Sequence, residues 1–299
     1  ERELYELNMQ KNPITGLIPM EEKQQELENT LSIKQQAQLS RRMSSSTYTS
    51  RGPSNLGGRT RAFAVDLSDD TSQTMLSGGV SSGLFRTTNG GDSWTKVSAN
   101  DEIHNVTALA QDPRDGHQNK WYYGTGELSG NSASLGAFYN GNGVWKSTDS
   151  GVTWTKITNI NDSEFTVFDV YADMINALEV NPVSGELFIA TYQKLYSFDG
   201  TNLTPEKDGP SGWTDVVIAS NGSVFASFQG DGVWTSPTGN GSWVQISPSS
   251  KTDWAPTGRI VLAEAPSNTN VIYALYVNGE EGIEADLWKY DLSTDTWTD

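Results

Sequence analysis

The sequence predicts an all-β fold made of repeated four-stranded sheets, and three observations carry the prediction. Aromatic residues nine positions apart recur along the chain, in the pairs Phe85 and Trp94, Trp145 and Trp154, Trp234 and Trp243, and Trp288 and Trp297. From Trp94 to Trp297 these repeats cover 203 residues in four steps of about 51 residues. Short alternating apolar segments separated by glycine-rich turns surround each pair, which excludes a helical solenoid. Repeated units of four short antiparallel strands are typical of a β-propeller, in which each unit forms one blade.

The N-terminal 45 residues differ from the rest and are expected to form a helical segment. Residues 21–42 contain no Gly or Pro, are rich in Glu, Gln, Lys and Leu, and follow Pro19, which is well placed to open a helix. Residues 46–58 are rich in Ser and Gly and are interpreted as a linker.

Residues 59–299 are expected to form the propeller, with blades at about 59–98, 104–158, 173–205, 213–247 and 257–299. Each blade opens with an alternating apolar strand, namely Ala62–Val65, Val106–Leu109, Ile175–Leu178, Val216–Ala219 and Ile260–Ala263. Three further strands follow in each blade. They are a second apolar strand, a strand that carries the first aromatic residue of the pair, and a strand at the closing tryptophan. The third blade keeps only Leu195 and Tyr196 of the motif, with Asp199 and Gly200. Because the sequence stops at Asp299, within the expected outer strand of the fifth blade, we expect an incomplete propeller or part of a larger ring of 7 to 10 blades.

The stretch from Ser147 to Trp154, STDSGVTW, resembles the Asp-box, or BNR repeat, of sialidase-like and sortilin-like propellers. Thr87–Trp94 matches it with Asn89 in place of the aspartate, and the copies that end at Trp243 and Trp297 are degenerate. In that family the box is a structural hairpin away from the ligand face. The resemblance therefore implies structural roles for Asn89, Gly91, Trp94, Asp149, Gly151, Trp154, Trp243 and Trp297.

A wider resemblance covers nearly the whole chain. The segments Arg51–Asp66, Gly78–Phe85 and Tyr122–Glu127, after a leader that contains Asn12–Pro19, resemble the opening of large propeller proteins exported by the type IX secretion system. This implies a secreted or cell-surface protein of the bacterial outer surface, with the type IX machinery as a partner. The C-terminal sorting domain of such proteins is expected beyond Asp299.

Composition restricts the remaining function classes. There are 37 acidic and 20 basic residues, and the net charge of −17 argues against nucleic acid and anionic membranes as partners. The sequence contains no cysteine and two histidines, so neither thiolate chemistry nor a zinc site is expected. No cofactor, metal or membrane insertion is expected.

Candidate ligand-binding residues come from the loops that connect second to third strands and one blade to the next, which gather on one face of a propeller. They are Arg59, Glu127, Asn131, Tyr139, Asp231 and Arg259. Carboxylates, amides and aromatic rings of this kind suit sugars. Arg59 and Arg61 could orient an anionic ligand, but pairing with acidic neighbours such as Asp66 is the expected use.

Two functions remain open. The favoured one is a non-catalytic binding or interaction protein for an extracellular glycan or a surface protein, without catalytic residues. The alternative is a xyloglucanase-like or sialidase-like glycoside hydrolase, in which Glu127 would face Asp231, Glu281 or Glu284 across a cleft. Xyloglucanase-like relatives carry an aspartate in the first blade between the second and third strands, whereas Gly79–Ser82 here has no acid. That difference disfavours hydrolysis.

Overall fold

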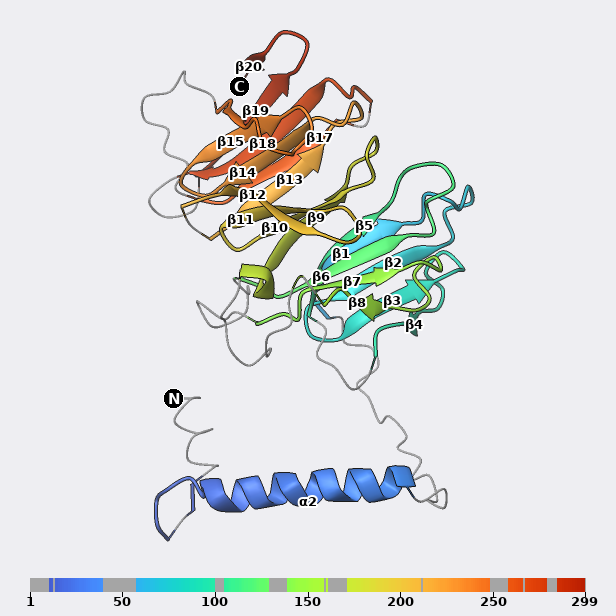
Figure 1. Cartoon of the computed structure of the whole chain (residues 1–299), viewed down its shortest axis with the longest axis vertical. Helices are drawn as coiled ribbons and strands as arrows, with labels where there is room; N and C mark the ends of the chain where they lie inside the picture. Colours follow the sequence, from blue (N-terminus) through green and yellow to red (C-terminus); the bar gives the residue numbers. More distant parts are fainter. Residues whose placement is uncertain are drawn as a thin grey trace. The chain divides into compact units, whose positions relative to one another are not determined.

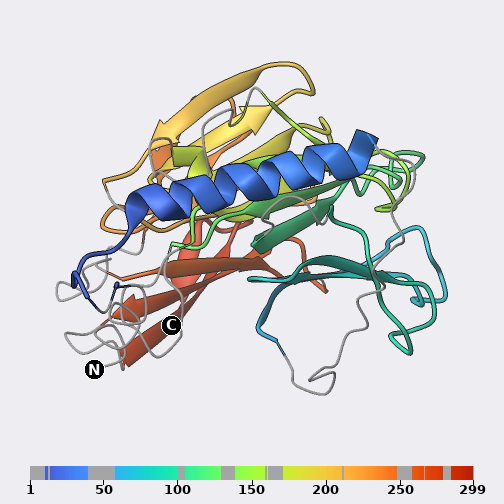
Figure 2. The same ribbon diagram turned by 90° about the horizontal axis from the view of Figure 1, so that it is seen from below.

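The computed structural model describes residues 11–12, 14–39, 58–99, 105–128, 139–158, 160, 171–210, 212–247, 258–265, 267–278 and 284–298 (Figure 1). The chain divides into two compact units, Glu1–Leu56 and Gly57–Asp299. In the first unit, α2 (Met20–Leu39) is a single helix of 20 residues (Figure 2). Among the described residues, no helix has both the length and the apolar character that a membrane span requires.

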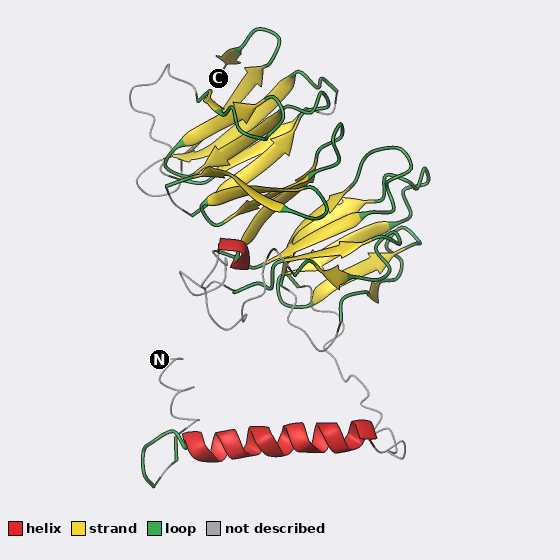
Figure 3. Ribbon diagram, in the orientation of Figure 1, coloured by secondary structure: helices red, strands yellow, loops and turns green. Residues whose placement is uncertain are grey.

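The second unit consists of five four-stranded antiparallel sheets, which we call blades 1 to 5 (Figure 3). Blade 1 contains β1 (Thr60–Val65), β2 (Met75–Gly79), β3 (Gly83–Thr87) and β4 (Thr95–Lys96). Blade 2 contains β5 (Val106–Gln111), β6 (Trp121–Thr125), β7 (Val144–Ser147) and β8 (Thr155–Lys156). Blade 3 begins after the 3-10 turn η1 (Tyr171–Asp173) and contains β9 (Ile175–Val180), β10 (Leu187–Thr191), β11 (Lys194–Phe198) and β12 (Leu203–Asp208). Blade 4 contains β13 (Thr214–Ile218), β14 (Val224–Phe228), β15 (Gly232–Ser236) and β16 (Val244–Gln245). Blade 5 contains β17 (Ile260–Glu264), β18 (Val271–Asn278), β19 (Glu284–Asp291) and β20 (Thr296–Thr298).

In every blade the strands are hydrogen-bonded in sequence order, and the first strands of successive blades lie next to one another, β1 with β5, β5 with β9, β9 with β13 and β13 with β17. The first strands are therefore the inner strands of a set of sheets arranged around a common centre. This confirms the predicted all-β fold of four-stranded blades.

Apolar cores lie between successive blades. Leu76 and Leu84 of blade 1 pack with Trp121, Tyr123 and Trp145 of blade 2. Equivalent clusters join blades 2 and 3, blades 3 and 4, and blades 4 and 5. Since burial of apolar area dominates folding, each blade is stabilised chiefly by its neighbours.

Two glycines set the spacing between inner strands. A Cβ added to Gly78 would lie 2.4 Å from Cγ1 of Val106, and one added to Gly124 would lie 2.3 Å from Cγ2 of Ile175. Each glycine sits on the second strand of its blade and faces a β-branched residue on the first strand of the next. Both positions therefore need a residue without a side chain for the blades to approach this closely.

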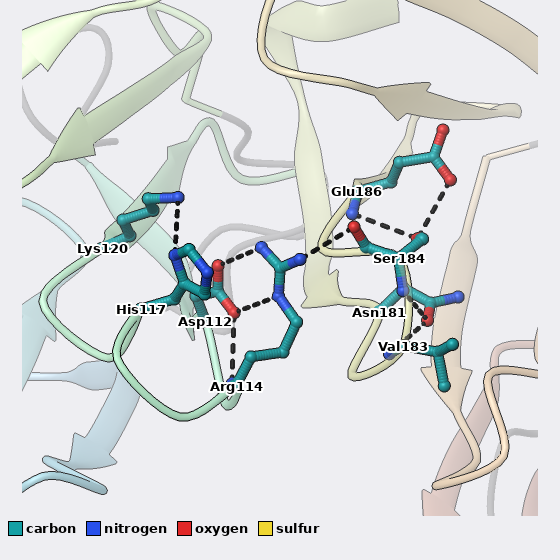
Figure 4. A network of polar contacts seen from close by, with 8 residues as sticks. All are labelled: Asp112, Arg114, His117, Lys120, Asn181, Val183, Ser184 and Glu186. Atoms are coloured by element: carbon teal, nitrogen blue, oxygen red, sulfur yellow. Dashed lines mark hydrogen bonds and ion pairs between the residues drawn. The ribbon is translucent and has the colours of Figure 1, made fainter.

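Polar contacts join the turns that follow the inner strands. Between blades 2 and 3, Arg114 Nη2 contacts Asp112 Oδ2 at 2.8 Å, and Arg114 Nη1 donates to the carbonyl of Ser184 at 2.9 Å (Figure 4). In the same view, His117 Nδ1 lies 3.2 Å from Lys120 Nζ. Three further contacts of this kind join the other blade pairs: Gln111 Nε2 to Asp66, Asn181 Nδ2 to the Gly222 carbonyl, and Ser220 N to Glu264.

The two terminal blades carry exposed apolar side chains. Phe63 on β1 is 57% exposed, and Leu287 on β19 is 54% exposed. Val65 and Leu275 are exposed as well. These residues alternate with the buried ones on their strands, so they lie on the blade faces opposite to the inter-blade cores.

Candidate functional site

Two arginines of blade 1 and one glutamate of blade 2 form a buried ion-pair cluster. Arg59 Nη1 donates to Glu127 Oε1 at 2.6 Å, and Arg59 Nη2 bonds Glu127 Oε2. Arg61 Nη1 donates to Oε1 at 3.0 Å. The side chain of Glu127 is fully buried, while Arg59 is 36% exposed and Arg61 is 19% exposed. Hydrogen bonding to Glu127 raises the pKa of Arg59 above its ordinary value. Both carboxylate oxygens are therefore committed to the two guanidinium groups.

The expected pairing of these arginines with an acidic residue is confirmed, but the partner is Glu127 and not the suggested Asp66. Asp66 Oδ1 instead accepts hydrogen bonds from Ser68 N, Ser68 Oγ and Gln111 Nε2, at 2.9, 2.7 and 2.7 Å. Arg61 stands near the start of β1, whereas Asp66 follows its last residue. Because a strand rises about 3.3 Å per residue, the two lie at opposite ends of the strand.

A second cluster forms where the inner strands of blades 4 and 5 begin. Trp213 precedes β13, and the guanidinium carbon of Arg259, which precedes β17, lies 4.4 Å from the centroid of its indole ring. The guanidinium carbon of Arg61 from blade 1 lies 5.6 Å from the same ring. A tryptophan of blade 4 thus contacts arginines of blades 1 and 5, so this end of the inner strands brings distant parts of the chain together.

Aromatic and amide side chains lie next to Gly212, the residue that precedes this tryptophan. Gln229 Oε1 accepts from Trp213 N at 3.2 Å, and Gln229 N donates to the Trp213 carbonyl at 2.9 Å. A Cβ added to Gly212, which directly precedes Trp213, would lie within 4 Å of side-chain atoms of Gln229, Leu128 and Tyr192. Tyr192 stacks on Tyr171 with ring centroids 6.3 Å apart and an interplanar angle of 12°. We call the residues Tyr171, Tyr192, Gln193, Trp213, Gln229 and Arg259 the Trp213 platform.

The backbone at Gln193 belongs to this arrangement. Its φ of 65° lies in the left-handed region, which non-glycine residues seldom adopt. Gln193 N donates to the Gly212 carbonyl at 3.1 Å, and its own carbonyl accepts from Gly209 N at 2.7 Å. These two bonds hold the β10 to β11 turn against the segment that carries Trp213.

Three acidic residues lie on the inner strands of consecutive blades: Glu179 on β9, Asp215 on β13 and Glu264 on β17. Burial, followed by the negative charges of Asp215 and Glu264, raises the pKa of Glu179 to about 7. Burial raises the pKa of Asp215 to about 6, against hydrogen bonds from Leu262 N and Val216 N and the charges of Arg259 and Arg61. Asp215 therefore belongs to the same electrostatic neighbourhood as the Trp213 platform.

The remaining candidate residues are distributed as follows. Tyr139 pairs with Glu127 through an isolated antiparallel bridge, with N to O distances of 2.8 and 2.9 Å, and its side chain is 42% exposed. Asp231 contacts Lys207 Nζ at 3.3 Å. Asn131, Glu281 and the side chain of Glu284 lie outside the described residues.

The residues assigned to the Asp-box lie in the hairpins between the third and fourth strands, except Trp297, which lies on β20. Asp149 Oδ1 accepts from Ser147 Oγ and from the backbone of Val152 and Thr153, and Gly151 has a φ of 77°. Trp154 Nε1 donates to the Gly151 carbonyl at 3.2 Å. Asn89 accepts from Thr87 and Ser93 in the same way, in the hairpin that contains Gly91 and ends at Trp94. Trp243 packs against the core of blades 3 and 4, and Trp297 Nε1 bonds the Ile246 carbonyl.

Sequence reasoning found Arg59, Glu127 and Arg259 but missed Tyr171, Tyr192, Trp213 and Asp215. A signal was available, because Trp213 and Arg259 occupy the same place, just before an inner strand, as Arg59 does. Trp213 was overlooked because it lies outside the repeated aromatic pairs.

Comparisons with known proteins support the same architecture. The chain matches no protein-family model. A xyloglucanase from Paenibacillus sp is 25% identical over 169 residues, which cover 53% of this chain and 13% of that protein. The solved GH74 enzyme of Niastella koreensis is 20% identical with a TM-score of 0.58, over 81% of this chain and 37% of that one. An ancestral GH74 enzyme is 16% identical with a TM-score of 0.60, over 81% of this chain and 31% of that one. This chain thus spans well under half the length of each of them, and the likeness confirms the β-propeller fold.

Proposed function

We propose that this chain is a glycan-binding β-propeller that has no catalytic activity of its own. The observation that carries the proposal is the Trp213 platform, in which Trp213, the stacked rings of Tyr192 and Tyr171, and the residues Gln193 and Gln229 belong to adjoining segments of blades 3 and 4. Aromatic rings offer flat apolar surfaces to the C–H faces of sugars, and amides both donate to and accept from hydroxyl groups. The platform unites both properties within one small region.

The state of Glu127 supports a binding role over hydrolysis. A glycosidase needs one carboxyl group that gives a proton to the leaving oxygen and a second that faces it across the sugar. Glu127 is buried, and both of its oxygens are bonded to arginines. It orients Arg59 and Arg61, and each of its oxygens already accepts at least one hydrogen bond from them. The turn between β2 and β3, Val80–Ser82, contains no acid.

Isothermal titration with a panel of soluble plant and bacterial oligosaccharides tests the proposal. We expect Trp213→Ala to weaken binding of the best ligand at least tenfold, which corresponds to about 1.4 kcal/mol. Trp94→Ala is the matched control, since Trp94 is also partly exposed but lies in the blade 1 hairpin. Equal affinity of the wild-type chain and Trp213→Ala for every ligand would refute the platform as the binding site.

Glycoside hydrolysis is the second candidate, because the chain is similar to a xyloglucanase and because the pKa of Asp215 is raised to about 6 beside Arg259. Release of reducing ends from xyloglucan decides between the two. If the chain binds sugars without turnover, the binding function stands. If it cleaves xyloglucan and Asp215→Asn abolishes cleavage, the hydrolase is correct.

We further propose that the chain acts outside the cell, at the bacterial outer surface, after export by type IX secretion. The resemblance of Arg51–Asp66 and Gly78–Phe85 to exported propeller proteins supports this location. Protease treatment of intact cells tests it, because a surface protein is degraded while cytoplasmic markers survive.

A further inference from the structure

Among the described residues, Arg259 has hydrogen-bonding capacity that no partner uses. Its guanidinium group stacks on Trp213, 4.4 Å from the ring centroid, and the residue is only partly exposed. Within the described parts of the chain, no side chain or carbonyl accepts a hydrogen bond from that group. A guanidinium carries five N–H donors, so this partly exposed group can donate to a ligand that reaches it.

The two neighbouring arginines are in a different state. Arg59 and Arg61 share Glu127, so one buried carboxylate offsets one of their two positive charges. Burial lowers the pKa of Arg259, and the positive charge of Arg61 lowers it further, against the opposing effects of Asp215 and Glu127. A carboxylate that reached Arg259 would add to the opposing charges of Asp215 and Glu127 and would stabilise the guanidinium ion.

The geometry points to a carboxylate as the missing partner. We propose that the glycan bound at the Trp213 platform is acidic and contains a uronic acid whose carboxylate is held by Arg259 while its ring lies against an aromatic side chain of the platform. This inference rests on the proposed glycan-binding function and specifies its ligand class. A guanidinium binds a carboxylate through two parallel N–H···O bonds, and its contact with the Trp213 ring holds this group at the platform.

The overall charge makes this recognition selective. A net charge of −17 repels polyanions at long range, so an acidic glycan gains nothing from the field of the whole molecule. It would be recognised by direct contact at Arg259, beside the guanidinium group of Arg61, which lies over the same indole ring. Affinity for the carboxylate should therefore depend on this one side chain.

The experiment compares an oligogalacturonide with the same oligosaccharide after its carboxyl groups have been reduced to alcohols. By isothermal titration we expect the wild-type chain to bind the acidic form at least tenfold more tightly than the neutral form. Arg259→Gln should bind both forms equally, and Arg259→Lys should keep part of the preference. Arg86→Gln is the control, because Arg86 bonds the Ser150 carbonyl between blades 1 and 2, away from Trp213, and it should keep the full preference.

Each outcome has a distinct meaning. Equal affinity of the wild-type chain for the two forms overturns the inference while leaving the glycan-binding function intact. A preference that persists in Arg259→Gln overturns the role of Arg259. Binding of neither form, nor of any other sugar in the panel, refutes the proposed function as well. Circular dichroism of each variant establishes that it is folded before its affinity is compared.

Discussion

The carboxylate of Asp149 is committed to the hairpin that contains it. Its Oδ1 accepts from Ser147 Oγ at 2.7 Å and from Thr153 N at 2.9 Å, and its Oδ2 accepts from Thr153 Oγ1 at 2.5 Å. Burial raises the pKa of Asp149, but hydrogen bonds from Thr153, Ser147 and Val152 outweigh it and bring the pKa to about 2. The motif is thus explained by local bonding, without a ligand.

Replacement of Asp149 should cost stability and leave binding unchanged. We expect Asp149→Ala to lower the free energy of unfolding by about 1 to 2 kcal/mol, because several hydrogen bonds are lost at a partly exposed site. Urea denaturation measures the change, with Thr148→Ala, an exposed neighbour in the same turn, as control. Loss of sugar affinity in folded Asp149→Ala would show that the hairpin itself contacts the ligand.

The inner-strand acids predict a pH dependence of stability. The pKa of Glu179 rises from 4.5 to about 7 in the folded chain, so the folded state holds its proton more tightly than the unfolded state does. The stabilisation is complete below pH 4.5 and is lost as the pH rises through about 7. Asp215, with a pKa raised to about 6, acts in the same direction.

The free energy of unfolding of the wild-type chain should therefore fall between pH 5 and pH 7.5. That of the Glu179→Gln variant should fall less steeply, because glutamine cannot ionise. The midpoint of urea denaturation across this range measures both slopes. A Glu179→Gln slope as steep as that of the wild-type chain would contradict burial of this carboxyl group beside Asp215 and Glu264.

At residue scale, the sequence shows which side chains have the chemistry of a binding site. It shows only in part which residues these side chains contact. Arg59 and Arg61 were expected beside Asp66, five to seven positions away, and they bind Glu127, more than 60 positions away. Contacts between blades depend on how the sheets are arranged around the centre, and propensity and periodicity carry no information about that. Glu179 was not predicted as a buried acid, because it occurs within an ordinary strand pattern and its acidic neighbours lie in other blades.

At the scale of elements, glycines on second strands and polar contacts between turns set how adjacent blades fit together. Gly78 and Gly124 allow the next inner strand to approach closely. A hydrogen bond joins each pair of adjacent blades near the turns that follow the inner strands. Between blades 2 and 3 it runs from Arg114 to the Ser184 carbonyl, and Arg114 also pairs with Asp112 (Figure 4).

Removal of Arg114 should destabilise the contact between blades 2 and 3. Asp112 is almost fully buried, and although burial raises its pKa, hydrogen bonds from Arg114 bring it below the usual value. Arg114→Ala leaves this carboxylate without its guanidinium partner, and we expect a loss of about 2 to 3 kcal/mol.

A double-mutant cycle isolates this pair. The double variant Asp112→Asn/Arg114→Ala should lose less free energy of unfolding than the sum of the losses in the two single variants. The reason is that Asp112→Asn removes the carboxylate that Arg114→Ala leaves unpaired. Strict additivity in thermal or urea denaturation would show that the two side chains do not stabilise each other.

The elements themselves were largely predictable. The alternating apolar segments at Ala62–Val65, Val106–Leu109 and Ile175–Leu178 all fall within inner strands, because an alternating pattern is a direct record of a two-sided sheet. Blade 3 shows where the motif fails, since its fourth strand, Leu203–Asp208, contains no tryptophan and pairs with β11 through a bulge. A fourth strand therefore forms without the aromatic pair.

At the scale of the whole molecule, five blades are packed in sequence, and the first and last of them expose apolar faces. We expect Phe63→Lys and Leu287→Lys each to change the free energy of unfolding by less than about 0.5 kcal/mol, because both side chains are more than half exposed. Both changes should also reduce self-association in light scattering, since a contiguous apolar face favours association.

The control is Leu84→Ser, which alters a fully buried residue of the core between blades 1 and 2 and should be strongly destabilising. A comparable loss of stability in Phe63→Lys or Leu287→Lys would mean that these faces are covered by another part of the chain.

The arrangement of blades also explains why the candidate site is only partly visible in the sequence. The residues of the Trp213 platform come from blades 3, 4 and 5, and Arg61 of blade 1 reaches the same tryptophan, because the inner strands of these blades begin at the same end. The period of the repeat predicts that these segments share a face. It does not predict which side chains on that face touch.

A crystal structure of the chain with its best oligosaccharide bound tests the central claim most directly. The account predicts a sugar ring stacked on Trp213 or Tyr192, with Gln193 or Gln229 hydrogen-bonded to its hydroxyl groups. A sugar bound instead at the hairpins of Trp94 or Trp154 would contradict it.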